Sequence, residues 1–312
     1  MHTLHDEHEH DLGLQHDLQV MALRLRERRR LLGLIAAGGA SLTLPACGGG
    51  SDDASTDTDT GTDTGTSTGT GTGTSTGTGT GTGTSTTDTG STTCLADPTE
   101  TQGPYPADGS NSVNGSVVNV LTQSGVVRSD IRSSFGGLSG TAAGLRTTLT
   151  ITLVDVNNSC APLSGYAIYL WHCTRDGTYS LYSSGVLNQN YLRGVQTTDA
   201  NGQCTFVTIF PACYSGRWPH IHFEVYKSAN SASSYTNKLL TSQMAMPADV
   251  CNAVYAQVSG YSASVSNLSK VSLSSDNVFG DNTAAQIAWQ TPAFTGDITD
   301  GYDATISIGL QA

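Results

Sequence analysis

Residues 48–93 most constrain what this chain can fold into. They consist almost entirely of Thr, Gly, Ser and Asp, with repeated Thr-Gly pairs, and they contain no aliphatic residue beyond Ala54 and no aromatic residue. A segment without apolar side chains has nothing to bury in a core, so residues 47–93 are predicted to be a flexible linker. The folded part is then residues 94–312, which fits a single domain.

Residues 1–46 are predicted to be an export signal. A basic cluster at residues 28–30 precedes an apolar run that is too short for a typical membrane-spanning helix. The paired arginines resemble a twin-arginine signal, and Leu-Pro-Ala-Cys at residues 44–47 resembles a lipobox that ends at Cys47. These resemblances predict an exported protein at the cell envelope, in the periplasm or on the extracellular face, anchored by a lipid on Cys47. A plain secretory signal is the alternative, and a start at Met21 would shorten it.

The composition of the chain limits the classes of molecule that it is expected to bind. The chain has 14 Lys and Arg against 26 Asp and Glu, a net charge of −12 at pH 7, which argues against nucleic acid. Six cysteines follow Cys47, and an even number in an exported protein predicts up to three disulfides whose pairing stays open. Their spacing matches no zinc finger or ribbon. They are Cys94, Cys160, Cys173, Cys204, Cys213 and Cys251.

The pattern of residues 94–312 predicts short strands. Residues 147–156 alternate Leu and Ile with Thr, which is typical of a half-buried strand. Further strands are predicted at residues 166–173, 204–210, 220–226, 239–246 and 305–310, separated by Gly, Asn and Asp turns. One short helix is predicted at residues 248–257. The predicted fold class is all-β: a single β-sandwich with long loops and little helix.

The strand at residues 220–226 carries the strongest chemical signal. His220 and His222 are two residues apart, so on a strand both imidazoles project from one face and can reach one cation. Five of the eight histidines of the chain lie in residues 1–46, so this pair holds two of the remaining three. Tyr214 and Arg217 lie just before the strand in a turn rich in Gly and Pro. An ordinary polar strand face is the alternative interpretation of the pair.

Several motifs follow one another along the chain. They are Trp-His-Cys-Thr-Arg-Asp-Gly-Thr-Tyr-Ser at residues 171–180, Leu-Arg-Gly-Val-Gln-Thr-Thr-Asp at 192–199, Phe-Val-Thr-Ile-Phe-Pro at 206–211, and then Tyr214, Arg217 and His-Ile-His at 220–222. In this order they resemble the intradiol ring-cleavage dioxygenase family, above all its protocatechuate 3,4-dioxygenase-like branch. The resemblance spans about residues 100–246, and Ala212 stands where the family usually has glycine.

The resemblance implies a role for each residue of the site. The ligands of a non-haem Fe(III) ion would be Tyr179, Tyr214, His220 and His222, and Tyr214 would leave the ion when substrate binds. Arg217 would lie beside the substrate and stabilise negative charge on its ring, and Gln243 would lie next to the metal ligands. Tyr105, in Gly-Pro-Tyr at residues 103–105, would line the entrance and contact the substrate. His172, Trp171 and Trp218 are expected to be structural, and Cys213 to be in a disulfide rather than a nucleophile.

The chemistry explains these residue types. Two phenolates are hard anionic oxygen donors that offset much of the charge of Fe(III), and the cation supplies the stabilisation that deprotonates them. Neutral imidazoles complete the site, each expected to be held through its other nitrogen.

The implied activity is dioxygenation of a small aromatic diol. Both atoms of O2 would enter a catechol-type ring, which would open between its hydroxyl-bearing carbons to give a cis,cis-muconate-type diacid. The membrane would be contacted only through the lipid on Cys47, and the oligomeric state and the identity of the catechol stay open. Two other classes remain: a non-catalytic β-sandwich binding module on a tether, and a His-x-His site for zinc or copper, for which Glu224 lies on the same strand face.

Overall fold

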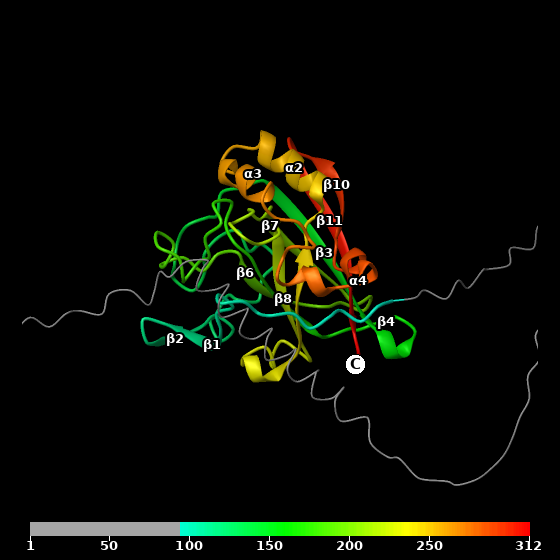
Figure 1. The fold of residues 1–312 in the computed structure, drawn as a ribbon. Helices are drawn as coiled ribbons and strands as arrows, with labels where there is room; N and C mark the ends of the chain where they lie inside the picture. The colour runs from blue at the N-terminus through cyan, green and yellow to red at the C-terminus, as the bar shows by residue number, and fades with distance from the viewer. Residues whose placement is uncertain (1–93) are drawn as a thin grey trace, which may run out of the picture. The chain divides into compact units, whose positions relative to one another are not determined.

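The computed structural model describes residues 94–312, which form two large β-sheets and a separate two-stranded hairpin (Figure 1). One sheet has the order β10-β11-β3-β4 with β7 also paired to β3, and the other has the order β6-β5-β8-β9. The strands of the first sheet are β3 (Arg146–Asp155), β4 (Ala161–Pro162), β7 (Gln203–Ile209), β10 (Ala293–Asp297) and β11 (Gly301–Leu310). Those of the second are β5 (Ala167–Trp171), β6 (Arg193–Thr197), β8 (His220–Tyr226) and β9 (Lys238–Ala245). The predicted all-β sandwich is confirmed.

Alternation along the strands creates the core. Leu149, Ile151 and Leu153 of β3 face the same apolar cluster as Ile221 and Val225 of β8. All seven residues of β8 are buried, so the second sheet is covered on both faces. Loops cover the outer face of the second sheet, and their apolar side chains form a second cluster with those of β5. The residues of the predicted site lie on this covered outer face.

The remaining elements surround the sandwich. A hairpin of β1 (Asp108–Val113) and β2 (Ser116–Asn119) stands apart from the sheets, and α2 (Ala248–Gln257) and α3 (Ser262–Leu268) lie together at one end (Figure 1). The other short elements are α4 (Ala284–Trp289) and the 3-10 turns η1 (Val156–Asn158), η2 (Tyr235–Asn237) and η3 (Phe279–Asp281). Among residues 94–312, none of the helices has the length and apolar character that crossing a bilayer requires.

The predictions made from patterns match the structure in most elements. Each predicted strand overlaps an observed one, and the predicted helix coincides with α2. The weak patterns of β1, β2, β4, β6, β10, α3 and α4 gave no prediction. The export signal, the lipid site at Cys47 and the linker at residues 47–93 lie outside the described residues.

The cysteines differ from the expectation. Within residues 94–312 the structure has one disulfide, Cys94–Cys160, and the other four cysteines are buried thiols. The prediction that Cys213 is disulfide-bonded is therefore wrong. Its Sγ lies in the core, 3.5 Å from the carbonyl oxygen of Arg217. Burial raises the pKa of this thiol to about 12, so it is a poor nucleophile as well.

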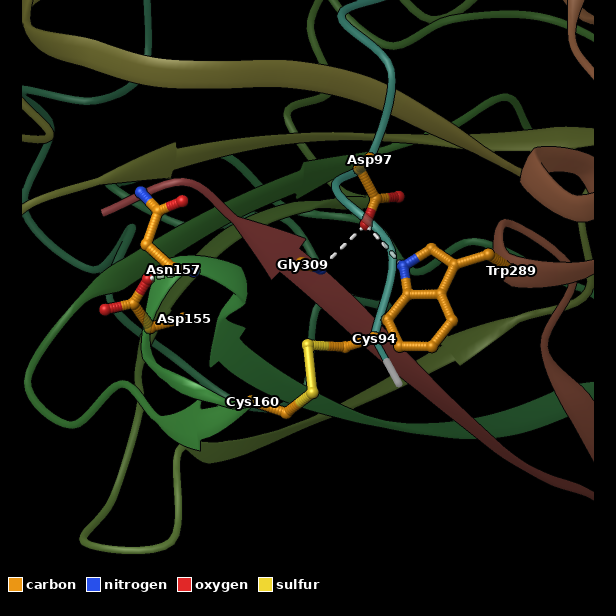
Figure 2. Close-up of a disulfide and its surroundings, with 7 residues drawn as sticks. All are labelled: Cys94, Asp97, Asp155, Asn157, Cys160, Trp289 and Gly309. Carbon is orange, nitrogen blue, oxygen red and sulfur yellow. Dashed lines mark hydrogen bonds between the residues drawn. A yellow bond between two sulfur atoms is a disulfide. The ribbon is translucent and has the colours of Figure 1, made fainter. Parts of the chain in front are cut away.

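The disulfide anchors the start of the domain to the first sheet. Three residues beyond Cys94, the carboxylate of Asp97 accepts hydrogen bonds from the Gly309 amide at 2.7 Å and from the Trp289 indole at 2.9 Å (Figure 2). Burial raises the pKa of Asp97 to about 7, far above its unfolded value of about 3.9. The folded state thus holds a proton that the unfolded chain releases. The stability this group contributes is complete below about pH 4 and is lost as the pH rises through about 7.

Replacing Asp97 by asparagine should flatten the pH profile of stability. The amide oxygen can still accept from Gly309 and Trp289, but the side chain no longer titrates. The free energy of unfolding, measured with denaturant from pH 4.5 to 7.5, should fall by up to about 3 kcal/mol less in the variant than in the parent. Glu224, whose pKa burial also raises to about 7, is present in both proteins and cancels in the comparison. Parallel profiles would contradict this account.

Candidate metal centre

Four polar side chains meet on the loop-covered outer face of the second sheet. The hydroxyl of Tyr179 lies 3.4 Å from Nε2 of His220 and 3.3 Å from Nε2 of His222. The hydroxyl of Tyr214 lies 3.3 Å from Nε2 of His220, and the two Nε2 atoms are 3.1 Å apart. The structure thus brings together all four residues that the sequence predicts as ligands.

The histidines come from β8, whose outer face they share. Nδ1 of His220 lies 2.6 Å from the carbonyl oxygen of Trp218 and must donate to it, so Nε2 carries the lone pair that faces the other donors. The ring of His222 stacks on Trp171 with centroids 4.9 Å apart, and Nδ1 of His222 has no hydrogen-bond partner within the described part of the chain. Burial, reinforced by neighbouring positive charge, lowers the pKa of both imidazoles well below the usual value. Both are therefore neutral at pH 7.

The tyrosines come from two loops that touch. Gly177, just before Tyr179, has φ +82°, and a Cβ atom there would lie 3.0 Å from Cβ of Tyr214. Glycine is thus required both for the backbone conformation and for the close approach of the loops. Tyr179 is 2% exposed, whereas Tyr214 is half-buried at the edge of the site. Burial raises the pKa of Tyr214 to about 12 and raises that of Tyr179 well above its ordinary value, so both are neutral phenols unless a cation binds.

Arg217 and Gln243 lie beside the four donors. Gln243 on β9 is paired across from His222, and its Oε1 accepts from Nη2 of Arg217 at 2.7 Å. Nη1 of Arg217 lies 3.5 Å from Nε2 of His220, so this end of the guanidinium faces the site. The side-chain amide of Gln243 also donates to the Thr101 carbonyl at 2.8 Å, which joins the site to the N-terminal segment.

That N-terminal segment forms part of the roof. Gly103 has φ +70°, and a Cβ atom at this position would lie 3.3 Å from Cε1 of His222. The ring of Tyr105 packs against Tyr179 with centroids 4.9 Å apart and against Tyr182 at 5.2 Å. Tyr105 is only partly buried, so it stands between the predicted ligands and solvent.

The donor set fits a ferric ion. The two hydroxyl oxygens and the two Nε2 atoms lie close enough to share one cation, and the phenols, which stay neutral at pH 7 without it, would become anionic ligands when it binds. Two ligands of one ion, each about 2.1 Å from it, are separated by about 3 Å when they subtend a right angle, close to the observed spacings. Among residues 94–312 no cluster of three or more His, Cys, Asp and Glu could hold a metal.

Glu224 does not join the histidines. Although it shares their strand face, its carboxylate accepts from Lys238 at 2.8 Å and from the Tyr226 hydroxyl at 2.6 Å. Because these two contacts engage the Glu224 carboxylate, they argue against the zinc-hydrolase alternative, in which a carboxylate would hydrogen-bond the metal-bound water. His172 is also engaged elsewhere: its ring nitrogens contact the Cys173 carbonyl at 2.8 Å and the Thr208 hydroxyl at 2.6 Å, and burial lowers its pKa to about 4.

Two charged residues near the site were missed by sequence reasoning. Arg193 lies inside the Leu-Arg-Gly motif but was given no role, and its guanidinium contacts the segments that carry Tyr105 and Tyr179. Asp276, which contacts Arg217, lies in a Ser-rich loop with no motif around it. The position of Arg193 inside a family motif is a signal that the sequence itself offers. Asp276 gives no such signal, because its partner is distant in sequence.

Comparisons with known proteins bear on the family and the fold of this domain. Residues 135–283 match a family model described as Dioxygenase. Among solved structures, the chain resembles an intradiol ring-cleavage dioxygenase from Tetranychus urticae at 21% identity and a TM-score of 0.52, covering 70% of this chain and 95% of that one. A second dioxygenase, Tetur07g02040, has the same identity and TM-score, with 70% and 94% covered. The comparison with curated proteins gave no match. The family match over residues 135–283 and the shared fold agree with what the motifs indicate: this domain has the fold of an intradiol ring-cleavage dioxygenase, and much of it matches a dioxygenase family model.

Proposed function

We propose that the domain is a non-haem Fe(III)-dependent dioxygenase. It would insert both atoms of O2 into a catechol-type aromatic and open the ring between the hydroxyl-bearing carbons, yielding a cis,cis-muconate-type diacid. The observation that carries this proposal is the convergence of two tyrosine hydroxyls and two imidazole Nε2 atoms, which are joined by four contacts of 3.1–3.4 Å. This donor set is that of a metal site with a strong demand for anionic oxygen.

The chain's own residues would prepare the substrate. A ferric ion held by Tyr179, Tyr214, His220 and His222 would bind both catechol oxygens and make the ring reactive toward O2. Tyr214 is the half-buried tyrosine, so it is the ligand with room to move aside, and its Oη would take a proton from a catechol hydroxyl. It would keep that proton at neutral pH, because burial raises its pKa to about 12.

Two further groups act on the bound ring. Nη1 of Arg217 faces the site and would stabilise negative charge that develops on the substrate during the reaction. Tyr105 and the backbone at Gly103 cover the site from the solvent side, so they would exclude water and limit the size of the ring. These roles are electrostatic and positional, and neither residue needs to bind the metal.

The visible absorption spectrum of the purified domain tests the function, with iron measured in the same sample. We expect a red-brown band from tyrosinate-to-iron charge transfer that shifts when a catechol is added without oxygen. Addition of ¹⁸O2 should then give a diacid with label in both carboxyl groups. A colourless iron-replete protein would contradict the ligand set. Stoichiometric zinc or copper would support the other-metal alternative, and catechol binding without turnover would support a binding module.

A further inference from the structure

Asp276 is a buried carboxylate that binds Arg217. It lies in the loop between α3 and η3 and is 2% exposed. Oδ2 accepts from Nε of Arg217 at 2.9 Å and from the Trp218 amide at 2.7 Å. Oδ1 accepts from Nη2 of Arg217 at 3.4 Å and from the amides of Val278 and Phe279 at 2.8 and 3.1 Å. The carboxylate is thus fixed by backbone groups on two sides and holds the guanidinium from a third.

These contacts leave one end of the guanidinium directed at the metal site. Asp276 and Gln243 bind Nε and Nη2 of Arg217, while Nη1 lies nearest to His220. Because the guanidinium is planar and rigid, fixing two of its nitrogens fixes the direction of the third. Gln243 alone binds Nη2 at one point, so it leaves rotation about that contact open. The carboxylate of Asp276 removes this freedom.

The buried charge of Arg217 also indicates a role for Asp276. Arg217 is 1% exposed, and a buried guanidinium without a counterion is strongly disfavoured. The salt bridge to Asp276, whose side chain is fully buried, offsets that cost without using the end that faces the site. Without the carboxylate, the guanidinium would be drawn toward solvent or toward other acceptors, away from the place where substrate charge develops.

We propose that Asp276 is a positioning residue for ring cleavage. It aims Nη1 of Arg217 at the ring of the bound catechol and keeps the guanidinium charged inside the protein. It contacts neither substrate nor metal and acts through Arg217 alone. This inference rests on the proposed function.

A double-mutant cycle on the iron-loaded domain tests it. Asp276→Asn should lower kcat about 10- to 100-fold, as expected for a misplaced catalytic group, while KM changes less than about threefold. In an Arg217→Gln background the same substitution should change kcat by less than about threefold, because the group it positions is gone. Equal effects in both backgrounds, or an active Asp276→Asn protein, would overturn the inference. Asp281→Asn is the matched control: the same change at an exposed carboxylate five residues further along should leave kcat unchanged.

Two readouts do not depend on turnover. The tyrosinate-to-iron band of Asp276→Asn, and its shift with anaerobic catechol, should match those of the parent, and loss of the band would show that Asp276 supports the ligands instead. In the metal-free protein, Asp276→Asn should lower the free energy of unfolding less in the Arg217→Gln background than in the parent, because both lose a carboxylate oxygen that accepts from backbone amides but only the parent loses the salt bridge. Equal losses in the two backgrounds would overturn the pairing. A colourless, inactive parent would instead overturn the proposed function and this inference with it.

Discussion

Tyr179→Phe should abolish the visible band and lower ring cleavage by more than about 100-fold, the loss that changing even the outer partners of a metal ligand can cause. Tyr179 is buried between both histidines, with its hydroxyl 3.3–3.4 Å from each Nε2. Its removal leaves two neutral nitrogens and one half-buried phenol, so iron should be held weakly. Iron content after dialysis against a chelator, read together with the spectrum, checks this.

Tyr214→Phe should give a different result. Its hydroxyl contacts only His220 among the two histidines, at 3.3 Å, and it lies at the edge of the site. Iron should stay bound with a weaker, shifted band from Tyr179, while turnover falls by a similar factor because the proton acceptor for the catechol is gone. A variant that kept parental turnover would contradict the role of Tyr214 in accepting the proton.

Tyr302→Phe serves as the control for both substitutions. Tyr302 is a buried tyrosine on β11, in the sheet that does not carry the site, so the same loss of a hydroxyl should leave band and turnover unchanged. If the spectra of Tyr179→Phe and Tyr214→Phe both equal that of this control, the assignment of the metal ligands is wrong.

The sequence predicts those features that depend on residues close together in the chain. Alternation in β3 and the His-x-His spacing in β8 depend on neighbours along one strand, so they are readable without the fold. The orientation of His220 by the Trp218 carbonyl is also local. The approach of Gly103 to His222 and of Asp276 to Arg217 joins segments far apart in the chain, and no periodicity encodes it.

The cysteines illustrate the same limit. An even number of cysteines predicts disulfides, but pairing requires that two backbones approach to within a few ångströms, which only the fold decides. Cys94 and Cys160 meet because the start of the domain runs along β11 beside the end of β3. Cys213 instead fills a core position, where it behaves as a small apolar side chain.

Arg193 offers the largest expected effect on stability. Its guanidinium is 1% exposed and donates to the carbonyls of Tyr105, Pro106 and Ser180, to the Ser180 hydroxyl at 3.0 Å and to the Tyr169 hydroxyl at 3.3 Å. All of these acceptors are neutral oxygens. Apart from Tyr169 on β5, they belong to the N-terminal segment that covers the site and to the loop that carries Tyr179, so one side chain connects both to β6.

The backbone around these contacts is strained. Ala107 has φ 51°, Leu181 φ 72° and Leu192 φ 56°, a left-handed region that costs a residue with a Cβ about 1 kcal/mol or more. Each is a direct neighbour of Arg193 or of a residue that Arg193 binds. Such conformations persist only where surrounding contacts determine them, and the guanidinium supplies contacts next to Ala107 and Leu181 through Pro106 and Ser180.

Arg193→Met should therefore lower the free energy of unfolding of the metal-free domain by about 3 kcal/mol or more, since several buried carbonyls lose charged donors at once. Arg193→Lys should recover little of this, because one ammonium cannot span acceptors arranged for a planar fork. Denaturant unfolding measures both, and faster amide exchange at residues 103–107 and 179–183 should accompany the loss. Arg132→Met, which breaks an exposed pair with Asp130, is the control and should cost less than about 1 kcal/mol. If Arg193→Lys or Arg193→Met matched this control, the strained segments would have to be held by other contacts.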